Sequence, residues 1–121
     1  MSRPALIDIT LWRGATFEQS YELLDETGAV LDLTGSKLHW RATALDDDET
    51  EVFNYVSGTD TQVLIEDEAG GVVTLSLSAA IARAIPVSRL TRYELERRID
   101  GSEEPLLAGY IIGEGGANDD A

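Results

Sequence analysis

The chain has 121 residues, the size of one domain with one hydrophobic core. Its 9 Lys and Arg residues against 23 Asp and Glu residues give a formal net charge of -14, which would repel nucleic acids and anionic membranes, so we expect neither as a partner. The absence of cysteine excludes disulfides, thiolate zinc sites and cysteine nucleophiles.

The first predicted strand covers residues 16–24, where apolar and polar side chains alternate. Phe17, Tyr21 and Leu23 fall on one face of such a strand, and the other face carries Thr16, Glu18, Ser20 and Glu22. A turn at 25–28, in which Gly28 can adopt a positive φ, leads to a short return strand at 29–33, so the segment predicts a hairpin. Residues 1–15 contain no signal-peptide block, and we expect a protein made and used in a cytosol.

The alternation is cleanest at residues 37–44. Leu38, Trp40, Ala42 and Ala44 share one predicted face, opposite Lys37, His39, Arg41 and Thr43, and Trp40 is the leading candidate for the core. The acidic segment 46–51 predicts a solvated loop, because its carboxylates repel one another. Further strands are expected at 52–56, 61–65 and 72–77. A short helix should follow at 78–84, capped by Ser78 and ended by Pro86.

Two strands close the predicted fold. Residues 90–99 alternate again, with Arg97 as an exception that a β-bulge or a strand end would explain; the residues assigned to the apolar face are Leu90, Tyr93, Leu95 and Ile99. Residues 106–112 are apolar on both faces, which indicates a strand in the centre of a sheet or beneath a partner. Seven or eight short strands and one short helix predict a mainly β domain, an antiparallel β-sandwich of immunoglobulin-like or jelly-roll-like type over residues 1–113. Residues 114–121 form a flexible acidic tail in this prediction.

The sequence contains no recognisable catalytic motif, and we expect neither enzymatic activity nor a cofactor or metal. His39 is the only histidine and shares its predicted face with Lys37 and Arg41, so we expect a solvated histidine rather than a base or a ligand. The acidic loop 46–51 offers the oxygen atoms that Ca²⁺ prefers, but its spacing is not that of an EF-hand. Whether this loop binds calcium stays open.

Basic residues gather in the second half of this acidic chain, at Arg83, Arg89, Arg92, Arg97 and Arg98. The cluster predicts either a salt-bridged strand face or a docking patch for an acidic surface, such as another copy of the chain. The candidate docking residues are Arg92, Arg98, Leu106, Tyr110 and Ile112.

Several segments follow one another in an order that resembles a family of tailed-bacteriophage structural domains, akin to the N-terminal domain of baseplate upper proteins. The segments are "LWRGATFEQSYELLDETGAVLDLTGSKLHWRA", "GGVVTLSLSAAIARAIP" and "RYELERRIDGSEEPLLAGYIIGEGG". Within them, the matching motifs lie at residues 14–17, 31–35, 73–78, 93–95 and 106–109, and the resemblance spans roughly residues 12–113.

The resemblance implies a virion structural protein that is made in the host cytoplasm and acts as an adaptor in the tail or baseplate. Its partners would be other virion proteins and copies of itself, in a homo- or hetero-oligomer. Two alternatives stay open. One is a neck or capsid-decorating protein of the same particle. The other is a carbohydrate-binding or adhesin-like sandwich, for which Trp12 and Tyr55 are the candidate aromatics, although we expect both in the core.

Overall fold

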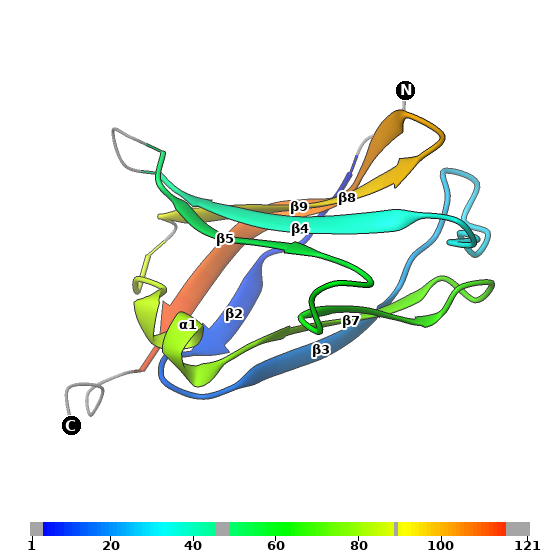
Figure 1. The fold of residues 1–121 in the computed structure, drawn as a ribbon. Helices are drawn as coiled ribbons and strands as arrows, with labels where there is room; N and C mark the ends of the chain where they lie inside the picture. The colour runs from blue at the N-terminus through cyan, green and yellow to red at the C-terminus, as the bar shows by residue number, and fades with distance from the viewer. Residues whose placement is uncertain (1–3, 46–48, 89, 116–121) are drawn as a thin grey trace.

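The computed structural model describes residues 4–45, 49–88 and 90–115, which form two β-sheets packed face to face (Figure 1). The larger sheet has the order β1-β9-β8-β4-β5, with β2 also paired to β9. Its strands are β1 (Ala5–Leu6), β2 (Ile9–Trp12), β4 (Lys37–Ala44), β5 (Glu51–Val56), β8 (Thr91–Ile99) and β9 (Ser102–Glu114). The smaller sheet has the order β3-β7-β6, from β3 (Phe17–Glu22), β7 (Val72–Leu77) and β6 (Val63–Asp67). The fold is therefore the predicted β-sandwich.

Strand pairing is antiparallel except along one edge, where β1 and β2 run parallel to β9. The two short strands form one edge of the larger sheet, and the Tyr93 hydroxyl donates a hydrogen bond to the Ile7 carbonyl between them. The sequence analysis assigned no strand to this N-terminal segment. β9 consequently has neighbours on both sides, which confirms the central position predicted from its apolar residues at 106–112.

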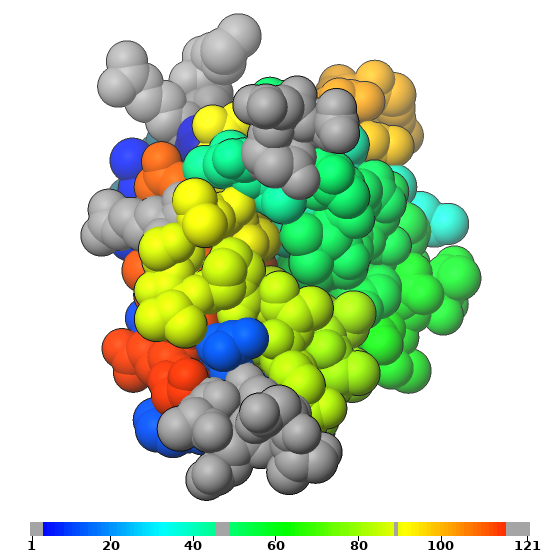
Figure 2. Space-filling view, turned by 90° about the vertical axis from the view of Figure 1, so that its left-hand side faces the viewer, coloured from blue at the N-terminus to red at the C-terminus, as the bar shows by residue number. Residues whose placement is uncertain are grey.

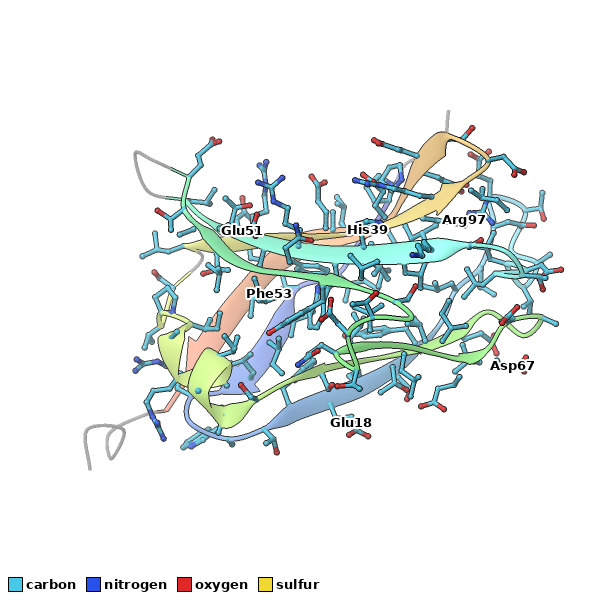
Figure 3. The ribbon with its side chains drawn as sticks, viewed as in Figure 1. Glu18, His39, Glu51, Phe53, Asp67 and Arg97 are labelled. Atoms are coloured by element: carbon cyan, nitrogen blue, oxygen red, sulfur yellow. The ribbon has the colours of Figure 1, made fainter. Side chains whose placement is uncertain are left out.

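The core between the sheets is built on Trp40, whose side chain is 0% exposed. Its ring meets that of Phe53 edge to face, with 4.6 Å between ring centroids. Phe53 lies between the two sheets in Figure 3. Leu38 and Ala42 flank Trp40 on the same face and are equally buried, so the parity predicted for residues 37–44 is confirmed.

The helix α1 (Ala79–Ala84) also follows the prediction. The Ser78 hydroxyl accepts a hydrogen bond from the Ile81 N–H at 3.3 Å and caps its first turn. Arg13 reaches across from the end of β2, and its guanidinium donates to the carbonyls of Ile85 and Arg83 at 2.8 and 3.1 Å. Figure 2 shows α1 and the segment after it (yellow-green to yellow) lying across this end of the sandwich.

The return strand expected at 29–33 does not form. Gly28 has the predicted positive φ of 86°, but only one isolated bridge joins Leu24 to Val30. The Asp25 carboxylate accepts hydrogen bonds from the N–H groups of Thr27 and Ala29 and holds a tight turn instead. The chain then carries Leu31 and Leu33 into the core, so their apolar spacing reflects burial rather than a strand.

Two details of the last strands differ from the sequence reading. Leu90 precedes β8 and is 50% exposed, so it does not share the buried face of Tyr93 and Leu95. Glu114 belongs to β9 and pairs with Trp12, so the strand continues one residue into the segment predicted as a tail; residues 116–121 lie outside the described residues. The irregularity expected near Arg97 is confirmed as a register shift between Leu95 and Glu96.

Candidate docking surfaces

The outer face of the larger sheet brings together most of the predicted docking residues. Arg92 lies opposite Tyr110 on β9, and Arg98 lies opposite Lys37 on β4. Because side chains alternate along a strand, Arg92 and Glu94, which flank the buried Tyr93, point away from the core. We call this surface the outer face and define it by Lys37, His39, Arg41, Arg92, Glu94, Glu96, Arg98, Tyr110 and Ile112.

Ion pairs tie part of the outer face together. Arg98 lies 2.7 Å from Glu96 and 3.8 Å from Glu103. The hydrogen bond to Glu96 raises the pKa of the Arg98 guanidinium above its ordinary value. Arg41 lies 3.3 Å from Glu51. Arg92 makes no ion pair with any described residue, and its side chain is exposed. The face thus combines the salt-bridged strand expected from the sequence with two cations, Lys37 and Arg92, that form no ion pair with the residues the structure describes.

His39 lies among these charges, partly exposed, on the face opposite Glu18 (Figure 3). Partial burial lowers the pKa of its imidazole, and the nearby Arg98 and Lys37 lower it further. The side chain is therefore neutral around pH 7. Its partly exposed place on the outer face agrees with the solvated strand histidine that the sequence predicted.

Leu106 does not join the outer face. The register shift opposite Glu96 makes it the extra residue of β9, since Leu95 pairs with Leu107 and Glu96 with Pro105. Its side chain packs against the core and lines a cavity of about 360 Å³ between β3 and the β1–β9 edge. Four of the five predicted docking residues therefore share one surface, and the fifth lies elsewhere.

The cavity and the edge of β3 beside it were missed by the sequence analysis. Four of the residues that line the cavity carry carboxylates: Glu22, Asp25, Glu26 and Glu104. These residues come from segments about 80 positions apart, and only the packing of the two sheets brings them together. Local patterning offers no signal for such a site.

The two candidate sugar-stacking aromatics lie on opposite edges of the larger sheet. Trp12 ends β2 and is 62% exposed, so its predicted burial in the core is wrong; the short edge strand leaves its ring outside the sandwich, next to Gly115. Tyr55 stacks on Phe53 at 5.0 Å on the β5 edge. The two rings do not form a common platform.

The part of the chain that the structure describes offers neither a clustered metal site nor a membrane-spanning helix. Within it, no three His, Asp or Glu side chains gather as a set of metal ligands. Part of the acidic loop, residues 46–48, lies outside the described ranges, so calcium binding by this loop stays an open alternative from the sequence. None of the described helices is long and apolar enough to cross a bilayer.

Comparison with solved structures shows the fold. The chain matches a chain of a crystal structure of ICOS in complex with ICOS-L and an anti ICOS-L VNAR domain, with a TM-score of 0.52 and 12% identity over 92% of this chain. It spans 56% of the matched chain. No family model and no curated protein matches the sequence. Of the two types expected, this likeness supports an immunoglobulin-like sandwich as the fold.

Proposed function

We propose that this chain is a non-enzymatic docking module that joins other proteins through the outer face of its larger sheet. The observation that carries the proposal is the placement of charge. Lys37, Arg41, Arg92 and Arg98, four of the nine Lys and Arg residues of a chain with net charge -14, share that face. The same face carries Glu94 and Glu96, and two of its arginines are paired with Glu51 and Glu103, so it is close to neutral in an otherwise acidic molecule. Such a face can meet an acidic surface, including that of a further copy, with less repulsion than the rest of the chain would cause.

Apolar contact area lies next to Arg92 on the outer face. Tyr110 and Ile112 are partly exposed on β9, and Tyr110 is directly opposite Arg92. Tyrosine and arginine are enriched at the centres of protein interfaces because they combine contact area with directed hydrogen bonds. Arg92 and Tyr110 are therefore the pair that we expect at the centre of the contact.

We further propose that the particle served by this docking is a tailed-bacteriophage virion, with the chain acting in the tail or baseplate. The support is the ordered resemblance described above, whose motifs coincide with scaffold elements. Residues 31–35 carry the buried Leu31 and Leu33, and residues 73–78 are β7 and the cap of α1. A neck or capsid-decorating position in the same particle would use the same docking chemistry.

Charge reversal on the outer face tests the docking proposal. Arg92→Glu combined with Arg98→Glu should reduce incorporation into purified particles by at least about tenfold, since each reversal replaces an attraction by a repulsion. Incorporation is measured by mass spectrometry of particles from complemented deletion phage. Arg83→Glu is the matched control, because Arg83 is exposed on α1, at the end of the sandwich.

The deletion phage itself tests the virion assignment. Particles that lack the gene product should be incomplete or non-infectious when examined by electron microscopy and plating. Normal, infectious particles without the protein would contradict a structural role and return the carbohydrate-binding alternative, with the exposed Trp12 as its starting point.

A further inference from the structure

The edge of the smaller sheet at β3 is regular and open. β3 has a neighbour on one side only, β7, and the six residue pairs between them run without a register shift. The Leu23 N–H donates to the Gly71 carbonyl at 2.7 Å in the same register. Because hydrogen-bonded pairs alternate along an antiparallel ladder, the backbone groups of Glu18, Ser20 and Glu22 point away from β7.

The other long edges are less accessible to a new strand. On β5, the Val56 N–H donates to the Asp60 carboxylate at 2.8 Å, and the Val56 carbonyl accepts from the Asp60 N–H at 2.8 Å. On β6, the register shifts between Ile65 and Asp67. Bulges and self-capped edges are devices that prevent strand addition. The pairing of β3 with β7 has no register shift, and the side-chain cap that the structure describes on its open side is a single exposed amide.

A side chain of β3 already takes the place of a missing neighbour. Gln19 shares the inward parity of Phe17 and Tyr21, yet it is exposed, which shows that the sandwich is open beside it. Its amide turns back and donates to the Ser20 carbonyl at 3.1 Å, one of the groups that face the open side. An added strand would supply such donors along the whole edge.

The surroundings define the chemistry of that strand. Glu18 and Glu22 project from the outer surface of the smaller sheet, and Figure 3 shows Glu18 pointing away from the larger sheet. On the inward side lies the 360 Å³ cavity, with Tyr21 and Leu106 among its walls. Its described lining residues include carboxylates and no cation, although one of the carboxylates, that of Glu104, is ion-paired with Arg97. One face of an added strand therefore meets carboxylates, and the other meets mainly apolar side chains with carboxylates among them.

We propose that the free edge of β3 receives an extended segment of a partner protein in which lysine or arginine alternates with apolar residues. This rests on the docking function proposed above and adds the chemistry of one partner. A second copy of β3 does not fit, because antiparallel pairing centred on Ser20 would set Glu18 directly opposite Glu22 of the other chain. An alternating basic segment matches both the charge and the period of the edge.

The test uses the purified full chain and an octapeptide that alternates lysine and valine, with blocked ends. Two further octapeptides carry backbone N-methyl groups on all lysines or on all valines, so composition and charge stay the same. In antiparallel pairing the lysine amides face β3, and in parallel pairing the valine amides do. One methylated peptide should bind at least about tenfold more weakly than the parent, and the other should bind like it.

Binding is followed by NMR, and amide shifts should concentrate on β3 and the cavity walls. Ser20→Pro removes an N–H that faces the open side and should weaken binding at least about tenfold, whereas Ser20→Ala, which loses the same hydroxyl, should not. Glu18→Gln with Glu22→Gln should weaken binding, and the exposed Glu66→Gln on β6 should not. Equal binding of all three peptides, or shifts that map to another edge, would overturn the inference. Because no virion is involved, failure here would leave the incorporation experiment to judge the proposed function separately.

Discussion

At the scale of single residues, the two tryptophans show how one residue type takes two roles. Trp40 sits on an eight-residue strand with a neighbour on each side, and packing from the opposite sheet covers its ring. Trp12 ends a four-residue edge strand and is 62% exposed. The difference lies in position within the sandwich, since both residues fall in alternating segments.

Trp40→Ala should lower the free energy of unfolding by about 3–5 kcal/mol, because it removes buried apolar surface and leaves a cavity. Trp12→Ala should change it by less than about 1 kcal/mol, as expected for an exposed side chain. Denaturant melts followed by circular dichroism measure both variants without relying on tryptophan fluorescence. Similar losses of unfolding free energy in the two variants would contradict the assignment of Trp40 to the core and of Trp12 to the surface.

At the scale of elements, the turn between β6 and β7 depends on a glycine. Gly71 has a φ of 67°, and a Cβ built on it would lie 2.6 Å from the Leu31 carbonyl oxygen and 2.9 Å from that of Leu23. Both contacts are backbone atoms, which cannot rotate away. The turn is therefore packed against the segment that leads out of β3.

Gly71→Ala should cost about 2–4 kcal/mol, from the left-handed backbone and from displacement of the neighbouring chain. Gly58→Ala is the matched control. Gly58 has a φ of 85° with nothing within 4 Å of the added carbon, and the substitution should cost about 1 kcal/mol. Thermal melts of the two variants give the comparison, and equal losses would mean that the close approach at Gly71 contributes nothing.

At the scale of the whole molecule, charge repulsion opposes folding. A net charge of -14 on 121 residues destabilises the compact state, and added salt screens it. The local ion pairs of Arg41 and Arg98 act in the opposite direction, but both involve partly exposed side chains and contribute little.

Raising sodium chloride from about 10 mM to about 150 mM should therefore increase the melting temperature, by roughly 2–8 °C for a gain of about 1 kcal/mol. Choline chloride at the same ionic strength should act equally, because the effect is one of screening. A melting temperature that falls with salt would show that the ion pairs outweigh the net repulsion.

How much the sequence could predict differs between the fold and the candidate sites. The buried parity of residues 37–44, the cap at Ser78 and the irregularity near Arg97 were all predictable, because each depends on neighbours close in the chain. The pairing of β8 with β9 places four candidate docking residues, Arg92, Arg98, Tyr110 and Ile112, on one face, and their docking role stays a prediction. Leu106 was misplaced because one register shift changes the direction in which a side chain points.

The sequence by itself determined which side chains of the regular strands face the core, as at residues 37–44, and that the chain would be an acidic β-sandwich. Alternation with a period of two records the two faces of a strand locally, and composition sets the net charge. Only the tertiary structure decided which strands are neighbours. The parallel pairing of β1 and β2 with β9, and the edge of β3 that this leaves open, depend on backbone hydrogen bonds between distant segments. Backbone groups are the same in every residue except proline, so the pattern of side chains in one strand does not indicate which other strand it will pair with.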